Sequence, residues 1–171
     1  MNKVIHRFLM VALYFILLII LYLTYQGFLG VVDLIIESNT SFYDLANQNV
    51  LAAYRSTLII CISLLAIIGL TFKIRKLGWI LAISSLVFFI LAILRFLITE
   101  FLSINGWKLF VLSFDKGNWF PVLLMVLSLG LLSFLIYSKE KFQINSKLKN
   151  NLLITLALLS ATDLIIFFSM N

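Results

Sequence analysis

The sequence predicts an all-α integral membrane protein built as a bundle of five transmembrane helices. Two features of the composition support this prediction: 63% of the 171 residues are hydrophobic, and only 12% are charged. A soluble domain is about half apolar and about a quarter charged, and a chain of this size cannot bury so large an apolar excess. The apolar residues also come in long blocks, which is typical of helices surrounded by lipid.

Five apolar blocks approach the ~20 helical residues that a hydrocarbon core of ~30 Å requires. They cover about residues 8–30, 50–72, 78–99, 121–138 and 152–169, and together they form a single polytopic domain over residues 1–171. The fifth block is short and contains Asp163. A body of four helices followed by a tail is therefore the alternative to five crossings.

Most basic residues gather on one predicted side of the membrane. Nine of the thirteen lie at the N-terminus or in two of the loops: Lys3, Arg7, Lys73, Arg75, Lys76, Lys139, Lys141, Lys147 and Lys149. The positive-inside rule makes this side cytoplasmic, so the N-terminus is cytoplasmic and the C-terminus lies outside after five crossings. The net charge of +6 is then topogenic and does not indicate a nucleic-acid partner. The asymmetry favours the bacterial inner (plasma) membrane, with an organelle membrane as the alternative.

The predicted outer segment from residue 27 to residue 50 is both acidic and apolar. Gly27 and Gly30 are predicted to separate the first span from a short helix lying on the membrane surface. Tryptophan prefers the headgroup layer of a bilayer, so the three indoles of the chain are predicted to be interfacial anchors. These are Trp79, Trp107 and Trp119.

Three ionisable residues lie inside predicted spans at similar depths. Counted from the outer helix ends at ~1.5 Å per residue, Arg55 is ~8 Å deep, Arg95 ~6 Å and Asp163 ~9 Å. A charged side chain in hydrocarbon costs a few kcal/mol, so it pairs, faces the bundle interior or reaches towards water. We therefore predict an intramembrane polar cluster of these three residues. The alternative is that both arginines reach the interface separately, with Asp163 at a water-accessible helix end.

Small and hydroxylated residues recur at helical spacing on the second, third and fifth blocks. Membrane helices use such residues to pack closely, because lipid supplies no hydrophobic force between helices. The predicted helix-packing residues are Ser56, Ser63, Ser85, Ala92 and Ser160.

Common catalytic motifs are absent from the sequence, and the raw material for a reactive site is scarce. The chain has one histidine, His6, one cysteine, Cys61, and seven scattered acidic residues. No catalytic residue, metal site or cofactor is predicted from these residue types. The remote alternative is a lipid-modifying enzyme that uses three outer acidic residues. These are Asp33, Glu37 and Asp44, whose spacing of four and seven would place them on one helical face.

The predicted cytoplasmic turn at residues 70–77, with the sequence LTFKIRKL, resembles the turn after the second span in immunity proteins for pore-forming colicins. The resemblance covers eight residues and leaves the fifth apolar block without a counterpart. It implies a protective partner that binds another membrane protein.

Three function classes follow from these observations. The first is a non-enzymatic membrane protein acting through protein–protein contacts, either an accessory subunit or a protective partner. The second is a small oligomeric transporter or channel component, in which the intramembrane charges attract or couple an ion. The third is the lipid-modifying enzyme. The expected partners are the lipid bilayer and either another membrane protein or further copies of the chain.

Overall fold

In the part of the chain that the structure describes, five helices follow one another in the order of the apolar blocks. The computed structural model describes residues 3–44, 47–72, 74–102, 119–138, 142 and 144–169. The helices are α1 (Lys3–Glu37), α2 (Gln48–Thr71), α3 (Arg75–Leu102), α5 (Trp119–Tyr137) and α6 (Ser146–Ser169). The described residues contain no strand, which confirms the all-helical prediction for this part of the chain.

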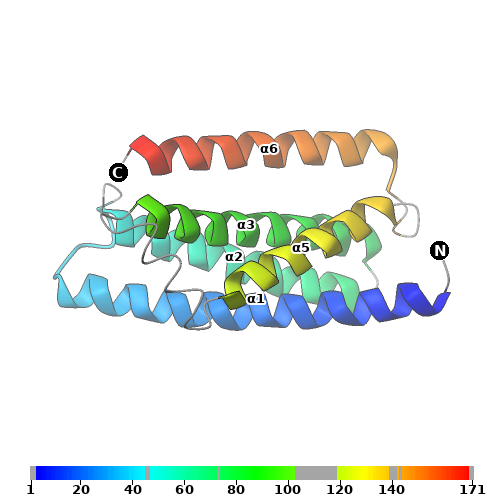
Figure 1. The fold of residues 1–171 in the computed structure, drawn as a ribbon, viewed down its shortest axis with the longest axis horizontal. Helices are drawn as coiled ribbons and strands as arrows, with labels where there is room; N and C mark the ends of the chain where they lie inside the picture. The colour runs from blue at the N-terminus through cyan, green and yellow to red at the C-terminus, as the bar shows by residue number, and fades with distance from the viewer. Residues whose placement is uncertain are drawn as a thin grey trace.

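Consecutive helices run in opposite directions, and α5 is inclined to the other four (Figure 1). α2 packs against both α1 and α3, while α5 crosses α3 and also contacts α1. α6 lies on the other side of α3 from α1, and its contacts with the body are mainly with α3. Leu156 is the one buried residue among the α6 side chains that the structure describes. α6 is therefore the helix held least by apolar packing.

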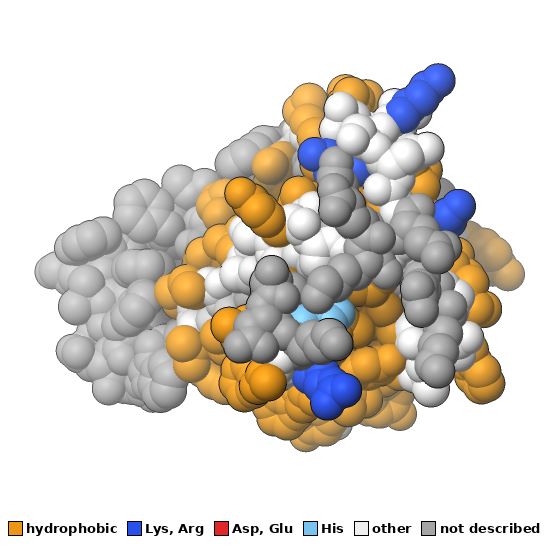
Figure 2. Space-filling model, turned by 90° about the vertical axis from the view of Figure 1, so that its right-hand side faces the viewer, with side chains coloured by type: hydrophobic (Ala, Val, Ile, Leu, Met, Phe, Trp, Pro, Cys, Tyr) orange, Lys and Arg blue, Asp and Glu red, His pale blue; other side chains and the backbone are white. Residues whose placement is uncertain are grey.

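One end of the bundle carries the N-terminus, the turn between α2 and α3 and the start of α6 (Figure 1). The basic side chains described near this end are Arg7, Lys76, Lys147 and Lys149. Figure 2 faces this end and shows Lys and Arg side chains around its rim, with no Asp or Glu visible among the described residues. The alternating helix directions thus gather the basic loops at one end.

The core is apolar, with a few hydroxyl groups. Fully buried residues from α1, α3 and α5 fill it, among them Leu13, Leu17, Ile20, Ile83, Leu86 and Leu135. Ser63 on α2 and Ser85 on α3 are also fully buried, and their hydroxyl oxygens lie 2.6 Å apart. This hydrogen bond satisfies two polar groups that would otherwise be costly in an apolar interior.

Four of the described helices are long and apolar enough to cross a membrane. These segments are Val4–Glu37, Asn49–Thr71, Lys76–Ile98 and Ser146–Ile165. The last of them includes the fifth apolar block, for which a tail was the alternative to a membrane crossing. It is extended at its start because the Asn145 side chain caps α6, accepting a hydrogen bond from the Leu148 N–H at 2.7 Å. α5 is the shorter helix: its 19 residues rise about 28 Å.

The predicted break at Gly27 and Gly30 is wrong, because α1 continues without interruption to Glu37. Two glycines in a helix cost roughly 1 kcal/mol each relative to alanine, which tertiary packing can offset. Here the extension packs through Ile35, which is fully buried against Val50 and Ala53 of α2. No separate surface helix precedes Glu37.

α1 ends in a Schellman motif at Asn39. The Thr40 N–H donates to the Ile35 carbonyl at 3.1 Å, and the Asn39 N–H donates to the Ile36 carbonyl at 3.1 Å. Asn39 has a φ of 52°, a left-handed conformation that asparagine tolerates better than most residues. The helix therefore ends where asparagine can reverse the chain.

The turn between α2 and α3 depends on two glycines that face each other. A Cβ atom added to Gly69 would lie 2.9 Å from the Gly78 Cα, and one added to Gly78 would lie 2.8 Å from the Leu70 nitrogen. The turn is closed by the Ile74 N–H, which donates to the Gly69 carbonyl at 2.9 Å. Backbone atoms form this contact, so a side chain at either position must push the two helices apart.

We expect Gly69→Ala and Gly78→Ala each to lower the stability of the protein in detergent by about 1–3 kcal/mol, the usual cost of overpacking. Gly30→Ala and Gly130→Ala are matched controls, since a Cβ atom there meets nothing within 4 Å. The controls should be neutral or stabilising by up to about 1 kcal/mol. Thermal unfolding of the four variants checks this. Equal effects at all four positions would contradict the close approach.

Candidate functional site

Asp163 on α6 contacts two arginines that come from two other helices. Its Oδ1 lies 3.2 Å from Nε of Arg55 on α2, and its Oδ2 pairs with Nη2 of Arg95 on α3. The same Nη2 donates a hydrogen bond to the main-chain carbonyl of Asp163 at 3.0 Å. One carboxylate therefore joins three helices.

The alternating helix directions bring these residues to one level. α2 begins at the end of the bundle where α3 and α6 finish (Figure 1). Arg55 lies about 10 Å from the start of α2, while Arg95 and Asp163 lie about 10 Å and 9 Å from the ends of their helices. A polar residue near the start of one helix thus faces polar residues near the ends of the two others.

The cluster is half-buried and carries a net positive charge. The side chains of Arg55, Arg95 and Asp163 are 31%, 13% and 25% exposed. Two guanidinium groups and one carboxylate leave a net charge of about +1, because arginine remains charged in proteins. Arg95 is the least exposed member of the cluster.

Arg55 uses only part of its hydrogen-bonding capacity. Its closest atom to the carboxylate is Nε, and its terminal nitrogens make no hydrogen bond to any residue that the structure describes. A guanidinium group has five N–H donors in a flat fork that fits a carboxylate or a phosphate. The cluster therefore offers donors to a further anionic group.

An open hollow of about 310 Å³ lies beside the cluster, between α2, α3 and α6. Both arginines and Asp163 form part of its wall, and the rest is almost entirely apolar. The remaining lining residues are Leu58, Ile59, Phe88, Leu91, Ala92, Leu159 and Thr162. The hollow thus combines an apolar wall with one charged side.

A second hollow, of about 540 Å³, lies between α1, α2, α3 and α5. Its polar lining is limited to Thr24 and Ser56, and the charged cluster does not line it. Ile59 and Ala92 line both hollows, so the contact between α2 and α3 separates them.

The predicted helix-packing residues occupy different environments. Ser63 and Ser85 form the buried hydrogen bond between α2 and α3. Ser56 is half-buried in the wall of the second hollow, and Ala92 is exposed between the two hollows. Ser160 is half-buried on α6, one turn before Asp163.

Trp79, predicted to be an interfacial anchor, has a side chain that is fully buried within the bundle. Its indole N–H donates to the Leu135 carbonyl at 2.8 Å. That carbonyl belongs to the last turn of α5, where backbone acceptors have no partner within the helix. Trp79 instead caps α5 and fixes it against α3.

The remaining predicted residues take no part in the cluster. Trp107 and the side chain of Trp119 lie outside the described residues. Asp33, Glu37 and Asp44 are exposed, and the described residues contain no group of three His, Cys, Asp or Glu side chains placed to hold a metal ion. The structure thus does not gather these three acidic residues.

His6, the one histidine in the sequence, lies near the start of α1. It is half-buried, and its ring centroid lies 5.6 Å from that of Phe134 on α5. The contact joins the start of α1 to the end of α5. Helix spacing alone could not predict it, since it depends on how α5 crosses the bundle.

Comparison of the chain with protein-family models, with curated proteins and with solved structures finds no match. The resemblance of residues 70–77 to immunity proteins therefore rests on those eight residues.

We expect Asp163→Asn, Arg55→Gln and Arg95→Gln each to destabilise the protein in detergent by roughly 1–3 kcal/mol. This range lies between the values for exposed and for fully buried ion pairs. The exchange Arg95→Asp with Asp163→Arg should recover part of the loss seen in the two single exchanges. Thermal unfolding measures each variant.

Asp33→Asn is the matched control, because Asp33 is exposed and makes no ion pair with a described residue. It should leave the unfolding temperature unchanged. A double exchange no more stable than its single variants would show that pairing does not hold the cluster together.

Proposed function

We propose that the chain is a non-enzymatic, multi-pass membrane protein that acts through lateral contacts with a helix of another membrane protein. Four helices long and apolar enough to cross a bilayer support its insertion. The basic end supports a cytoplasmic N-terminus. α5 completes five crossings if the bilayer thins slightly around it, which leaves the C-terminus outside. The proposed location is the bacterial inner membrane, with an organelle membrane as the alternative.

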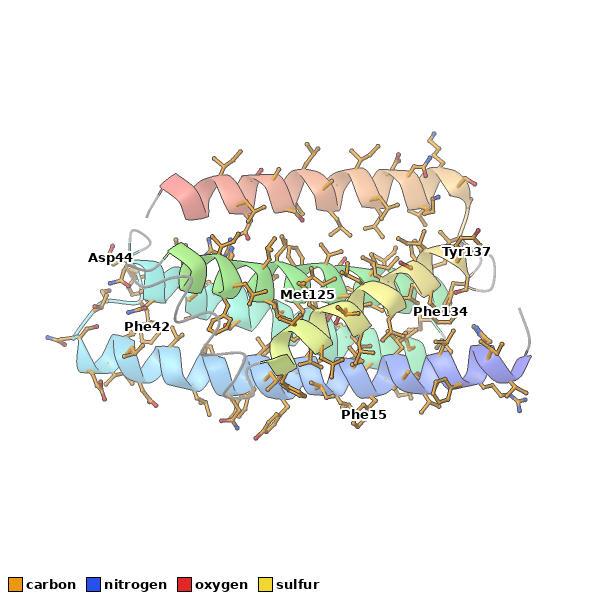
Figure 3. The ribbon with its side chains drawn as sticks, in the orientation of Figure 1. Phe15, Phe42, Asp44, Met125, Phe134 and Tyr137 are labelled. Atoms are coloured by element: carbon orange, nitrogen blue, oxygen red, sulfur yellow. The ribbon has the colours of Figure 1, made fainter. Side chains whose placement is uncertain are left out.

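The outer face of α1 is the observation that carries this proposal. Large apolar residues recur there at alternating intervals of four and three, and their exposed fractions range from 39% at Leu29 to 72% at Phe8. We call this set the α1 stripe: Val4, Phe8, Val11, Phe15, Leu18, Tyr22, Tyr25 and Leu29. Phe15, near its middle, points away from the bundle (Figure 3). This seven-residue repeat is the pattern by which two helices interlock in a left-handed pair.

Two tyrosines of the α1 stripe favour a protein partner over lipid alone. Tyr22 is 62% exposed and lies about 28 Å along α1 from Lys3, well inside the predicted span. The hydroxyl groups of Tyr22 and Tyr25 make no hydrogen bond to a described residue. Lipid tails offer no acceptor, and an unpaired hydroxyl in an apolar medium costs about 1–3 kcal/mol. A partner helix with polar groups at this depth would satisfy them.

This partner is either the main component of a complex or a protein that the chain protects. In both cases the function requires binding and no chemistry. The aromatic residues of the α1 stripe suit this role, because large rigid side chains supply much contact area at a small entropic cost. The opposite face of α1 is occupied by the core of the bundle, so the α1 stripe is the face available to a partner.

A transporter component is the second candidate. Two hollows separated by Ile59 and Ala92, one of them beside a net positive cluster, favour it. Anion pathways are often lined by arginine. The described helices are continuous, however, whereas substrate sites in many transporters use helices broken near mid-membrane. The α1 stripe has no role in this second function.

Site-specific photocrosslinking in the native membrane tests the proposal. A photoreactive side chain at position 11, 15, 18 or 22 should crosslink to one protein, while the positions between them on the buried face should not. Ile154 and Leu158 on α6 are matched controls, because they are similarly exposed to the surroundings of the bundle at 59% and 65%. These control positions should crosslink to lipid only.

Which positions along α1 form crosslinks is a stronger test of the proposal than the capture of a protein. Crosslinks that follow the intervals of four and three identify a helix-to-helix contact. Lipid adducts at every stripe position would contradict the proposal. Adducts between two copies of this chain would show that the α1 stripe binds a second copy of the chain and not a different protein.

A further inference from the structure

We propose that the hollow between α2, α3 and α6 binds one anionic phospholipid, with its phosphate on Arg55 and part of an acyl chain along the apolar wall. This site lies on a different face from the α1 stripe. The inference therefore does not depend on the proposed protein partner.

The charge of the cluster selects an anionic ligand. Within the cluster one carboxylate faces two guanidinium groups, and Arg55 contacts it through Nε. The terminal nitrogens of Arg55 make no hydrogen bond to a described residue, and the side chain is 31% exposed. A phosphate accepts two parallel N–H donors from one guanidinium group. In a zwitterionic headgroup, the cation of the headgroup itself weakens the attraction between the phosphate and the arginines.

The apolar wall selects an amphiphile over a free anion. Apart from the cluster and Thr162, every residue that lines the hollow is apolar. Its volume of about 310 Å³ is at the lower end of the range for ligand sites. It therefore holds a segment of one chain, while the rest of the lipid stays in the bilayer.

The depth of the arginines matches a headgroup at the membrane surface. Arg55 and Arg95 lie about 10 Å from their helix ends, and α3 is about 42 Å long against a hydrocarbon core of about 30 Å. Their Cα atoms are then several ångströms inside the hydrocarbon boundary, a distance that an arginine side chain spans. With the N-terminus in the cytoplasm, this phosphate belongs to the outer leaflet.

Native mass spectrometry of the full chain in detergent tests the site. The probes are phosphatidylglycerol, phosphatidylcholine with the same acyl chains, and inorganic phosphate. We expect one phosphatidylglycerol to be retained and to raise the unfolding temperature, with no comparable effect of the other two probes. Equal retention of phosphatidylcholine would overturn the charge argument. A shift with inorganic phosphate alone would assign a small-anion site instead.

Two variants separate the headgroup contact from the wall. Arg55→Gln should weaken phosphatidylglycerol retention about tenfold, the loss expected for one charge-assisted contact of about 1.4 kcal/mol. Leu159→Trp should also weaken it by filling the hollow, while leaving all three charged residues in place. Lys147→Gln removes an exposed charge outside the hollow and should have no effect.

Unchanged retention in Arg55→Gln would overturn the proposal. If that variant fails to fold, Leu159→Trp tests whether phosphatidylglycerol binds in the hollow, since this substitution changes none of the three charged residues. Retention by Leu159→Trp equal to that of the unmodified chain would also overturn the proposal, because the lipid would then bind elsewhere.

Discussion

A carboxylate among apolar side chains requires cationic partners, and Asp163 forms ion pairs with two arginines. Its carboxylate sits on a short side chain, so it depends on partners that neighbouring helices bring to it. Arg55 and Arg95 meet it from α2 and α3. This requirement fixes the rotation and the level of α6, since only one face and one depth of that helix can satisfy the charge.

The remaining architecture depends on this constraint to different degrees. α1, α2 and α3 are joined by the apolar core, by the hydrogen bond between Ser63 and Ser85 and by the tight glycine turn. α6 adds Leu156 to that core, with Leu148 and Leu152 packed against it. α6 has little apolar burial, and its Asp163 carboxylate adds ion pairs to α2 and α3. Apolar packing therefore assembles the central helices, whereas α6 combines a small apolar contact with the ion pairs of Asp163. The hollow beside the cluster follows from the same arrangement, because α6 lies over α3 without filling the space around Arg55.

Depth counting along the helices predicted that Arg55, Arg95 and Asp163 share one level, and the structure brings their side chains into contact. The five helices could be predicted from the lengths of the apolar blocks. The differences arose where local preference competes with packing. Gly27 and Gly30 predict a break, yet Ile35 packs well enough to keep α1 helical. Trp79 has the position of an interfacial residue, yet a carbonyl at the end of α5 holds its indole inside. Neither contact is visible before the relative placement of the helices is known.

Electron–electron distance measurement in a lipid nanodisc tests most directly whether Asp163 fastens α6. Spin labels at Val11 on α1 and Ile154 on α6, with Cys61→Ser to remove the native thiol, report the position of α6 relative to the body; both label sites are exposed. A single narrow distance is expected for the native cluster. Asp163→Asn should broaden this distribution, because α6 then loses the interaction that fixes its rotation and level. An unchanged narrow distribution in Asp163→Asn would contradict the account.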